Sequence, residues 1–202
     1  MANSRSRQSP DLFSRLAQSL TGLFPARSRL LLGYSGGVDS TLLLHLLASV
    51  SAEHGWQIEC AHVHHGLSPN ADAWADACAA QCSALALPFT LLRVSIPANP
   101  PGGIECAARD ARYAALHAHA RTNAFDVLLT GHHADDQAET LLHNMVRGAG
   151  LLGLAGMPAR KPCDAEHVAS VRPLLAVSRA VLETCARERG LFDPRALETL
   201  ID

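Results

Sequence analysis

The sequence lacks the features that would place it in a membrane, on a secretory route or among strongly basic proteins. No apolar run reaches the ~20 residues that a membrane-spanning helix requires. The arginine-bearing first ten residues lead into no apolar core of signal-peptide type. Net charge at neutral pH is −2, so no overall basic field favours RNA or DNA. We therefore expect a cytoplasmic protein without membrane contact, in which any nucleic acid is held by a local patch.

Cysteine pairs and two common nucleotide-binding signatures are also missing. None of the six cysteines forms a CxxC pair, and their spacing has no disulfide-like rhythm. Cys78 and Cys82 are expected to be buried thiols on one helix face. The chain contains no GxxxxGK[ST] loop and no GxGxxG after a strand. With 48% hydrophobic and 18% charged residues, the 202-residue chain is expected to fold as one core-rich domain.

The strongest signal lies between two apolar runs, at 30–32 and 42–47. They flank Ser35-Gly36-Gly37-Val38-Asp39-Ser40, which predicts a buried strand, a tight turn and a helix beginning near the glycines. Glycine permits close approach, and the free N–H groups of a helix N-terminus attract phosphate. Asp39 would repel phosphate unless a divalent cation such as Mg²⁺ lay between them. The alternative is an ordinary turn with capping Asp and Ser side chains.

Alternating periodicities predict an α/β fold: a Rossmann-like parallel sheet with helices on both faces. Strands are expected over the run at 30–32 and at 56–64, 89–94, 125–130 and 168–175. Helices are expected at 11–20, 38–52, 70–85, 104–122, 134–147 and 178–189. Residues 1–10 are expected to be disordered, and the Pro- and Gly-rich stretch 97–103 predicts a loop able to act as a lid.

Polar clusters follow three of these strands, so they should meet at the carboxyl edge of the sheet. His62 and His64 share one side of the second strand. If the site binds a nucleotide, these two histidines would line its pocket, and the backbone of the strand would bond the edge of the adenine. The alternative is a dinuclear hydrolase site that adds the nearby histidines and carboxylates His132, His133, Asp135 and Asp136.

Charged residues on two predicted helices add candidates. Asp136 and Glu139 share a helical face and could hold Mg²⁺ or an ammonium group, although carboxylates at a helix start also serve as caps. Which of Asp135 and Asp136 faces the site stays open. Arg109 and Arg112 follow Glu105 on one face, where they form either a surface salt-bridge row or a pair that stabilises phosphate charge.

In this order the motifs resemble those of the N-terminal catalytic domain of tRNA(Ile)-lysidine synthetases. Residues 35–40 match the SGGxDS pyrophosphate loop (PP-loop), and residues 62–67 match an HVxHGL-type loop. Further matches are GxExxxRxxRY at 103–113, HxxDDQxET with RGxG and GL at 132–154, and RPLL with a later Arg at 172–179. The resemblance covers roughly residues 28–190 and implies an adenine nucleotide alpha hydrolase-like fold.

The resemblance implies an ATP-dependent ligase. It would attach L-lysine to C2 of the wobble cytidine, position 34, of tRNA(Ile) with a CAU anticodon. The cytidine C2 oxygen would attack the α-phosphate, pyrophosphate would leave, and the lysine ε-amine would displace AMP. In that scheme residues 35–40 hold the phosphates and Asp39 binds Mg²⁺. Arg109 and Arg112 neutralise charge, and Asp136 and Glu139 recognise lysine.

The end of the chain departs from the family pattern. We expect an extension with a short helix at 1–27, the catalytic domain at 28–190 and a short tail at 191–202 without the family's tRNA-gripping domains. ATP binding is then expected to survive. The alternatives are a thiolation-type PP-loop enzyme and a truncated nucleotide-binding module without turnover. The sequence leaves open whether the chain forms a homodimer.

Overall fold

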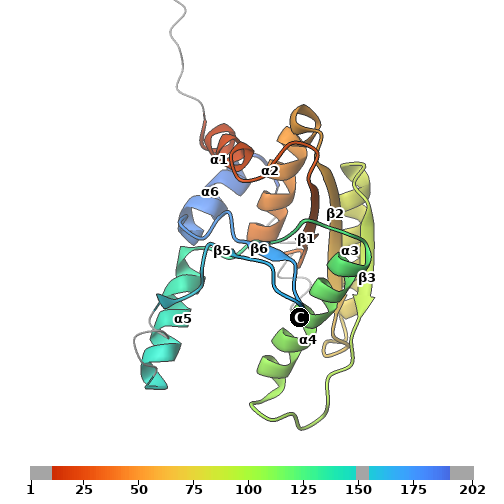
Figure 1. The fold of residues 1–202 in the computed structure, drawn as a ribbon, viewed down its shortest axis with the longest axis vertical. Helices are drawn as coiled ribbons and strands as arrows, with labels where there is room; N and C mark the ends of the chain where they lie inside the picture. Colours follow the sequence, from red (N-terminus) through yellow and green to blue (C-terminus); the bar gives the residue numbers. More distant parts are fainter. Residues whose placement is uncertain (1–10, 149–154, 192–202) are drawn as a thin grey trace, which may run out of the picture.

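A six-stranded sheet forms the centre of the computed structural model, which describes residues 11–148 and 155–191 (Figure 1). The strands lie in the order β3-β2-β1-β4-β6-β5, and all neighbours are parallel except the last pair. Their bounds are β1 Arg29–Gly33, β2 Gln57–His64, β3 Phe89–Arg93, β4 Val127–Thr130, β5 Arg160–Lys161 and β6 Ala169–Val171.

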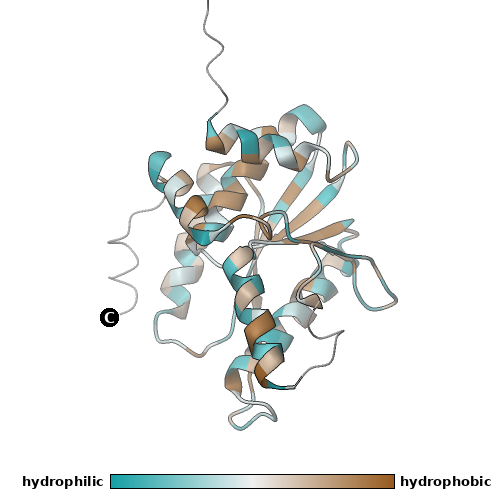
Figure 2. Cartoon of the chain, turned by 90° about the vertical axis from the view of Figure 1, so that its left-hand side faces the viewer, coloured by the Kyte–Doolittle hydropathy of each residue, from teal (hydrophilic) through white to brown (hydrophobic). Residues whose placement is uncertain are grey.

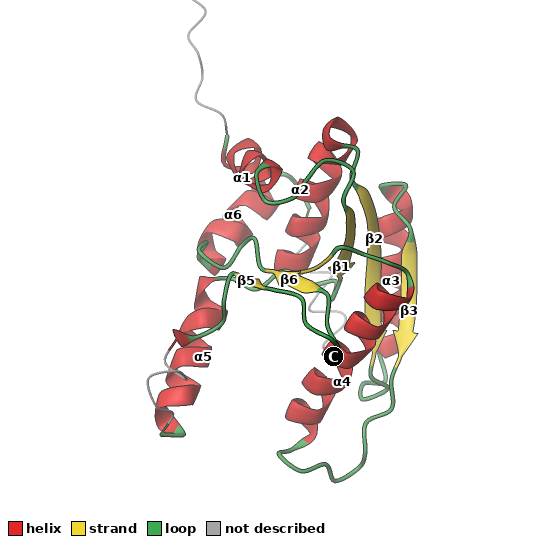
Figure 3. Ribbon diagram, in the orientation of Figure 1, coloured by secondary structure: helices red, strands yellow, loops and turns green. Residues whose placement is uncertain are grey.

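Helices cover both faces of this sheet, as predicted (Figure 3). One face carries α1, α2, α3 and α6, while α4 packs on the other. The fifth helix, α5, extends away from the sheet (Figure 1) and contributes no buried residue. The helix bounds are α1 Leu12–Thr21, α2 Val38–His54, α3 Ala71–Ala84, α4 Ile104–Thr122, α5 Ala134–Val146 and α6 Arg179–Glu188.

Two apolar clusters hold these layers together. The larger one joins α2 to alternate residues of the strands, such as Leu30 and Leu32, and the smaller one joins α4 to the other face through Leu31. The central strands are accordingly hydrophobic (Figure 2), because a parallel sheet buried on both faces needs apolar residues at every position. No helix within residues 11–148 and 155–191 is long and apolar enough to cross a membrane.

The predicted α/β class is confirmed, and the differences lie at the sheet's far edge. The expected strand at 168–175 is only three residues long, since Pro173 lacks the N–H that a longer ladder needs. Strand β5 was not predicted, because two exposed residues carry no periodic signal. The expected disorder of residues 1–10 and the tail beyond residue 191 lie outside the described residues. The lid role of 97–103 stays a prediction.

A buried histidine in the α4 layer gives the fold a pH dependence. His117 is 6% exposed, and its ring lies 4.6 Å from that of His167. Burial lowers the pKa of His117 to about 4, helped by the charges of His167, Lys161 and Arg121 and opposed by Asp164. In the unfolded chain the same group has the ordinary histidine pKa of 6.5.

Lowering the pH from 6.5 to about 4 is therefore expected to destabilise the fold through His117. In that window the unfolded state binds the proton and the folded state does not, so this group removes roughly 2–3 kcal/mol of unfolding free energy. Urea titrations at pH 7 and pH 4.5 should show a smaller loss for His117→Leu than for the unaltered chain. Equal losses would contradict this assignment.

Candidate functional site

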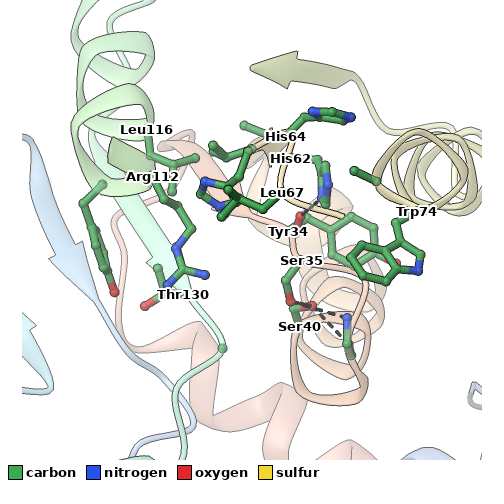
Figure 4. Close-up of a pocket in the computed structure, with 18 of the residues that line it drawn as sticks. Tyr34, Ser35, Ser40, His62, His64, Leu67, Trp74, Arg112, Leu116 and Thr130 are labelled. Carbon is green, nitrogen blue, oxygen red and sulfur yellow. Dashed lines mark hydrogen bonds between the residues drawn. The ribbon is translucent and has the colours of Figure 1, made fainter. Parts of the chain in front are cut away.

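A cavity of about 370 Å³ opens where β1, β2 and β4 end, between α2, α3 and α4. In Figure 4, Trp74 of α3 and Arg112 of α4 lie on opposite sides, with Ser35 and Ser40 below them. This is the carboxyl edge of the parallel strands, where the predicted polar clusters were expected to meet. Most of the predicted nucleotide-binding residues line it, namely Ser35, Gly37, Asp39, Ser40, His62 and His64.

The loop between β1 and α2 has the close-packed geometry that its glycines predict. Gly36 has φ +83°, and a Cβ there would lie 2.9 Å from Cys78 Sγ of α3. The hydroxyls of Ser35 and Ser40 are 2.9 Å apart, and Ser40 Oγ donates to the Gly37 carbonyl at 3.0 Å. Within residues 11–148 and 155–191, no side chain caps the N-terminus of α2. Its first N–H groups are therefore available to an anion.

The end of β4 packs directly against this helix start. A Cβ on Gly131 would lie 3.1 Å from both Cα and N of Ser40, so only glycine fits without displacement. Residues 131–136 consequently lie beside the loop at 35–40. The predicted convergence of these two motifs is confirmed.

Asp39 is a half-buried carboxylate with one atom left without a partner. Its Oδ1 is buried and accepts no hydrogen bond from the described residues, and its Oδ2 lies 3.5 Å from His133 Nε2. His133 Nδ1 accepts from the Asp136 backbone N–H at 3.3 Å, so the neutral ring carries its hydrogen on Nε2, toward Asp39. Burial raises the pKa of Asp39, while the charge of His133, present only when that ring is protonated, and the charge of Arg179 oppose that rise.

The three carboxylates that begin α5 have different surroundings. Asp136 Oδ2 accepts from the His133 backbone N–H at 2.9 Å and completes a capping box, while its charge also acts on Asp39. Asp135 Oδ2 accepts from the Arg179 backbone N–H at 2.8 Å and so joins α5 to α6. Glu139 is exposed on α5. Neither Asp136 nor Glu139 lines the cavity.

The histidines at the end of β2 are held in defined orientations. His62 donates from Nδ1 to the Tyr34 carbonyl at 2.9 Å, and burial lowers its pKa. His64 Nε2 lies 3.2 Å from Asp72 Oδ1. Within residues 11–148 and 155–191, no three His, Cys, Asp or Glu side chains are arranged to hold a metal ion. The dinuclear alternative therefore has no support.

Of the two predicted arginines, only Arg112 lines the cavity. Arg109 is exposed on the preceding turn of α4, and no ion pair joins either arginine to Glu105 in the described part of the chain. Close by, His132 bonds Thr130 Oγ1 at 2.8 Å and Tyr113 OH at 3.3 Å. Burial, with the charges of Arg172, Arg109 and Arg112, lowers the pKa of His132 to about 4, so this ring is neutral at pH 7.

Several residues of the site could not be anticipated. Trp74 forms an apolar wall together with Leu67 of the predicted loop at 62–67, but nothing in the local pattern of Trp74 marks it. The Gln137 side chain exchanges two hydrogen bonds with the backbone of Met157, at 2.9 and 2.7 Å, and thereby fixes the segment that follows the glycine-rich stretch. All six cysteines are free thiols, and Cys78 and Cys82 are buried as predicted.

Comparisons with curated proteins agree with the motif-based resemblance. The chain is 50% identical over 182 residues to a tRNA(Ile)-lysidine synthase of Pseudomonas fluorescens, covering 90% of this chain and 40% of that protein. It is 48% identical over 165 residues to one of Aromatoleum aromaticum, covering 82% and 37%. The chain thus spans about 40% of the length of these relatives.

Solved structures and a family comparison agree on the fold. The U34-tRNA thiolase NcsA from Methanococcus maripaludis, described with its [4Fe-4S] cluster, superposes with a TM-score of 0.76 at 17% identity, covering 88% of this chain and 64% of that one. A glutamine-dependent NAD⁺ synthetase from Acinetobacter baumannii gives a TM-score of 0.56 at 14% identity, with 94% and 35% covered. Residues 9–192 match the family described as the PP-loop domain. The chain therefore belongs to the PP-loop domain family.

Proposed function

We propose that this chain is the ATP-using part of a tRNA(Ile)-lysidine synthetase. It would attach L-lysine to C2 of the wobble cytidine, position 34, of tRNA(Ile) with a CAU anticodon and release AMP and pyrophosphate. The names of relatives at 48–50% identity support this reaction. The observation that carries the ATP step is the uncapped N-terminus of α2 at the base of the cavity.

ATP would lie along the cavity with its phosphates on the loop at 35–40. The uncapped N–H groups of α2 are suitable donors. The hydroxyls of Ser35 and Ser40, which bond each other and the Gly37 carbonyl, would have to exchange those bonds to donate to phosphate. Adenine would occupy the part of the cavity lined by Leu67 and Trp74, where the end of β2 carries His62 and His64. Apolar walls with a few polar groups are typical of nucleotide pockets.

Asp39 fits the role of a Mg²⁺ ligand. Its Oδ1 is buried and has no hydrogen-bond partner among the described residues, which is costly unless a cation or donor reaches it. Mg²⁺ commonly binds one carboxylate together with substrate phosphates, so a single protein carboxylate suffices. When bound, the ion would neutralise phosphate oxygens next to the loop. His133 would hold Oδ2 in place and leave Oδ1 free for that role.

Two arginines would assist the activation step. The C2 oxygen of cytidine attacks the α-phosphorus, and the bond to the pyrophosphate oxygen breaks. Arg112 faces the cavity and would stabilise the charge that develops on the α-phosphate. Arg109 lies exposed on the preceding turn of the same helix and would contribute from the rim.

Asp136 and Glu139 would recognise lysine. One carboxylate would bind an ammonium group, and one would accept the proton of the ε-amine, because only the neutral amine is a nucleophile. The neutral amine then attacks C2 of the adenylated cytidine and AMP leaves.

A thiolation enzyme is less well supported, because no cysteine lines the cavity and no CxxC pair is present.

Pyrophosphate release tests this proposal. The chain is incubated with ATP, Mg²⁺ and lysine, together with a tRNA(Ile) transcript that carries CAU or, as a control, UAU. We expect release with the CAU transcript only, because the UAU transcript lacks the wobble cytidine. Equal release with both transcripts, or binding of ATP without release under any condition, would contradict it.

A further inference from the structure

The start of α6 lies beside the phosphate loop, although its residues are about 140 positions away in sequence. The Ala134 backbone N–H donates to the Val177 carbonyl at 2.9 Å, and the Arg179 backbone N–H donates to Asp135 Oδ2 at 2.8 Å. These bonds join the start of α6 to the start of α5, and α6 also packs against α2. The N-termini of three helices therefore meet near Asp39.

Of these three helix N-termini, that of α2 is the one where no described carboxylate accepts from the first N–H groups. Carboxylates already occupy the other two helix starts, since Asp136 completes the capping box of α5 and Asp135 accepts from the first residue of α6. Further phosphate groups on this side of Asp39 would consequently need a cationic side chain to bind them. The carboxylates Asp136 and Asp135 offset the positive ends of the α5 and α6 dipoles, which makes these two helix starts less favourable to phosphate.

Arg179 is a cation at this position, and its side chain is weakly held. The side chain is 62% exposed, and Nε donates to Glu183 Oε1 at 2.9 Å, one turn along the same helix. Exposed pairs of this kind contribute little to stability, so the guanidinium can exchange Glu183 for a stronger anion at small cost. The charge of Arg179 also acts on Asp39. Burial raises the pKa of that carboxylate, and the guanidinium opposes the rise.

We infer that Arg179 is a further ATP ligand. Its guanidinium gives up the bond to Glu183 and binds the terminal phosphates that depart as pyrophosphate. This inference rests on the proposed function, because it needs triphosphate on the loop at 35–40. With adenine beside Trp74 and the inner phosphates on the N-terminus of α2, the terminal phosphates would extend past Asp39 and out of the cavity toward α6, which packs against α2. A guanidinium fork suits such an anion because it donates two parallel hydrogen bonds to phosphate oxygens.

Nucleotide affinities of the full 202-residue chain test this role. ATP, ADP and AMP are titrated with Mg²⁺ against the unaltered chain, Arg179→Ala, Arg179→Lys and Glu183→Gln. Arg187→Ala is the control, because Arg187 is exposed on the same helix and its replacement changes the charge equally. Arg179→Ala should weaken ATP and ADP by roughly tenfold or more, as expected for a lost charge-assisted hydrogen bond. AMP should bind with unchanged affinity.

The other variants sharpen the result. Arg179→Lys should recover part of the ATP affinity, and Glu183→Gln should bind ATP at least as tightly as the unaltered chain. Equal weakening of ATP and AMP, or the same loss in Arg187→Ala, would overturn the role of Arg179 while leaving the nucleotide site intact. Unchanged ATP affinity in Arg179→Ala would also overturn it. If the unaltered chain bound no nucleotide, the proposed function would fail and this inference with it.

Discussion

Replacing Asp39 by asparagine is expected to lower the rate of tRNA-dependent pyrophosphate release by roughly 10²–10⁴-fold, because metal assistance is worth several kcal/mol. The change keeps the shape of the side chain but removes its negative charge. It also replaces one carboxylate oxygen of the side chain by an amide N–H donor, which cannot bind a cation. In Asp39 itself, Oδ1 is buried and has no hydrogen-bond partner among the described residues. The concentration of Mg²⁺ needed for half-maximal release should rise in the same variant.

The matched control for this change is Asp110→Asn. Asp110 is exposed on α4, so the net charge changes equally while the cavity is left alone. Thermal unfolding of both variants separates catalytic loss from misfolding. Should Asp39→Asn release pyrophosphate as fast as Asp110→Asn, the assignment of Asp39 as the metal ligand would be wrong.

Replacing Gly36 by alanine is expected to weaken ATP binding by at least about tenfold, since a displaced loop loses charge-assisted bonds to phosphate. Gly36 has φ +83°, where an L side chain is strained, and the new Cβ would lie 2.9 Å from Cys78 Sγ. The loop would have to move away from α3 to relieve that contact. The movement displaces the donors that face the phosphates.

Two further variants separate the contact from the backbone strain. Gly190→Ala places alanine at φ +62° with no atom within 4 Å, so it should lose only the roughly 1–2 kcal/mol of stability that strain costs and keep its ATP affinity. Combining Gly36→Ala with Cys78→Ala removes Sγ and should restore part of the lost affinity. Isothermal titration with ATP measures all three. Equal ATP affinity in Gly36→Ala and Gly190→Ala would refute the packing argument.

The sequence predicts the fold and the meeting of the polar motifs at one edge of the sheet, because both depend on local patterns. Apolar runs such as 30–32 are buried on both faces of a parallel sheet, and the motifs that follow them necessarily share its carboxyl edge. The SGGxDS stretch likewise contains the geometry of its own turn, including the positive φ of Gly36.

Contacts between distant segments could not be predicted in this way. The pairing of His133 with Asp39 and that of Arg179 with Asp135 depend on how helices 44 or more residues apart meet, which no periodicity encodes. Spacing alone could not separate Asp135 from Asp136 either. The hydrogen bonds do so, because Asp135 joins α6 while Asp136 caps α5 beside Asp39.

The mass of the anticodon nucleosides tests the central claim most directly. A tRNA(Ile) transcript with a CAU anticodon is incubated with the chain, ATP, Mg²⁺ and lysine, then digested and analysed by mass spectrometry. The account predicts that cytidine 34 gains one lysine with loss of one water, and only when ATP and lysine are both present. An unmodified cytidine, or exchange of an oxygen for sulfur when a sulfur donor is supplied, would contradict it.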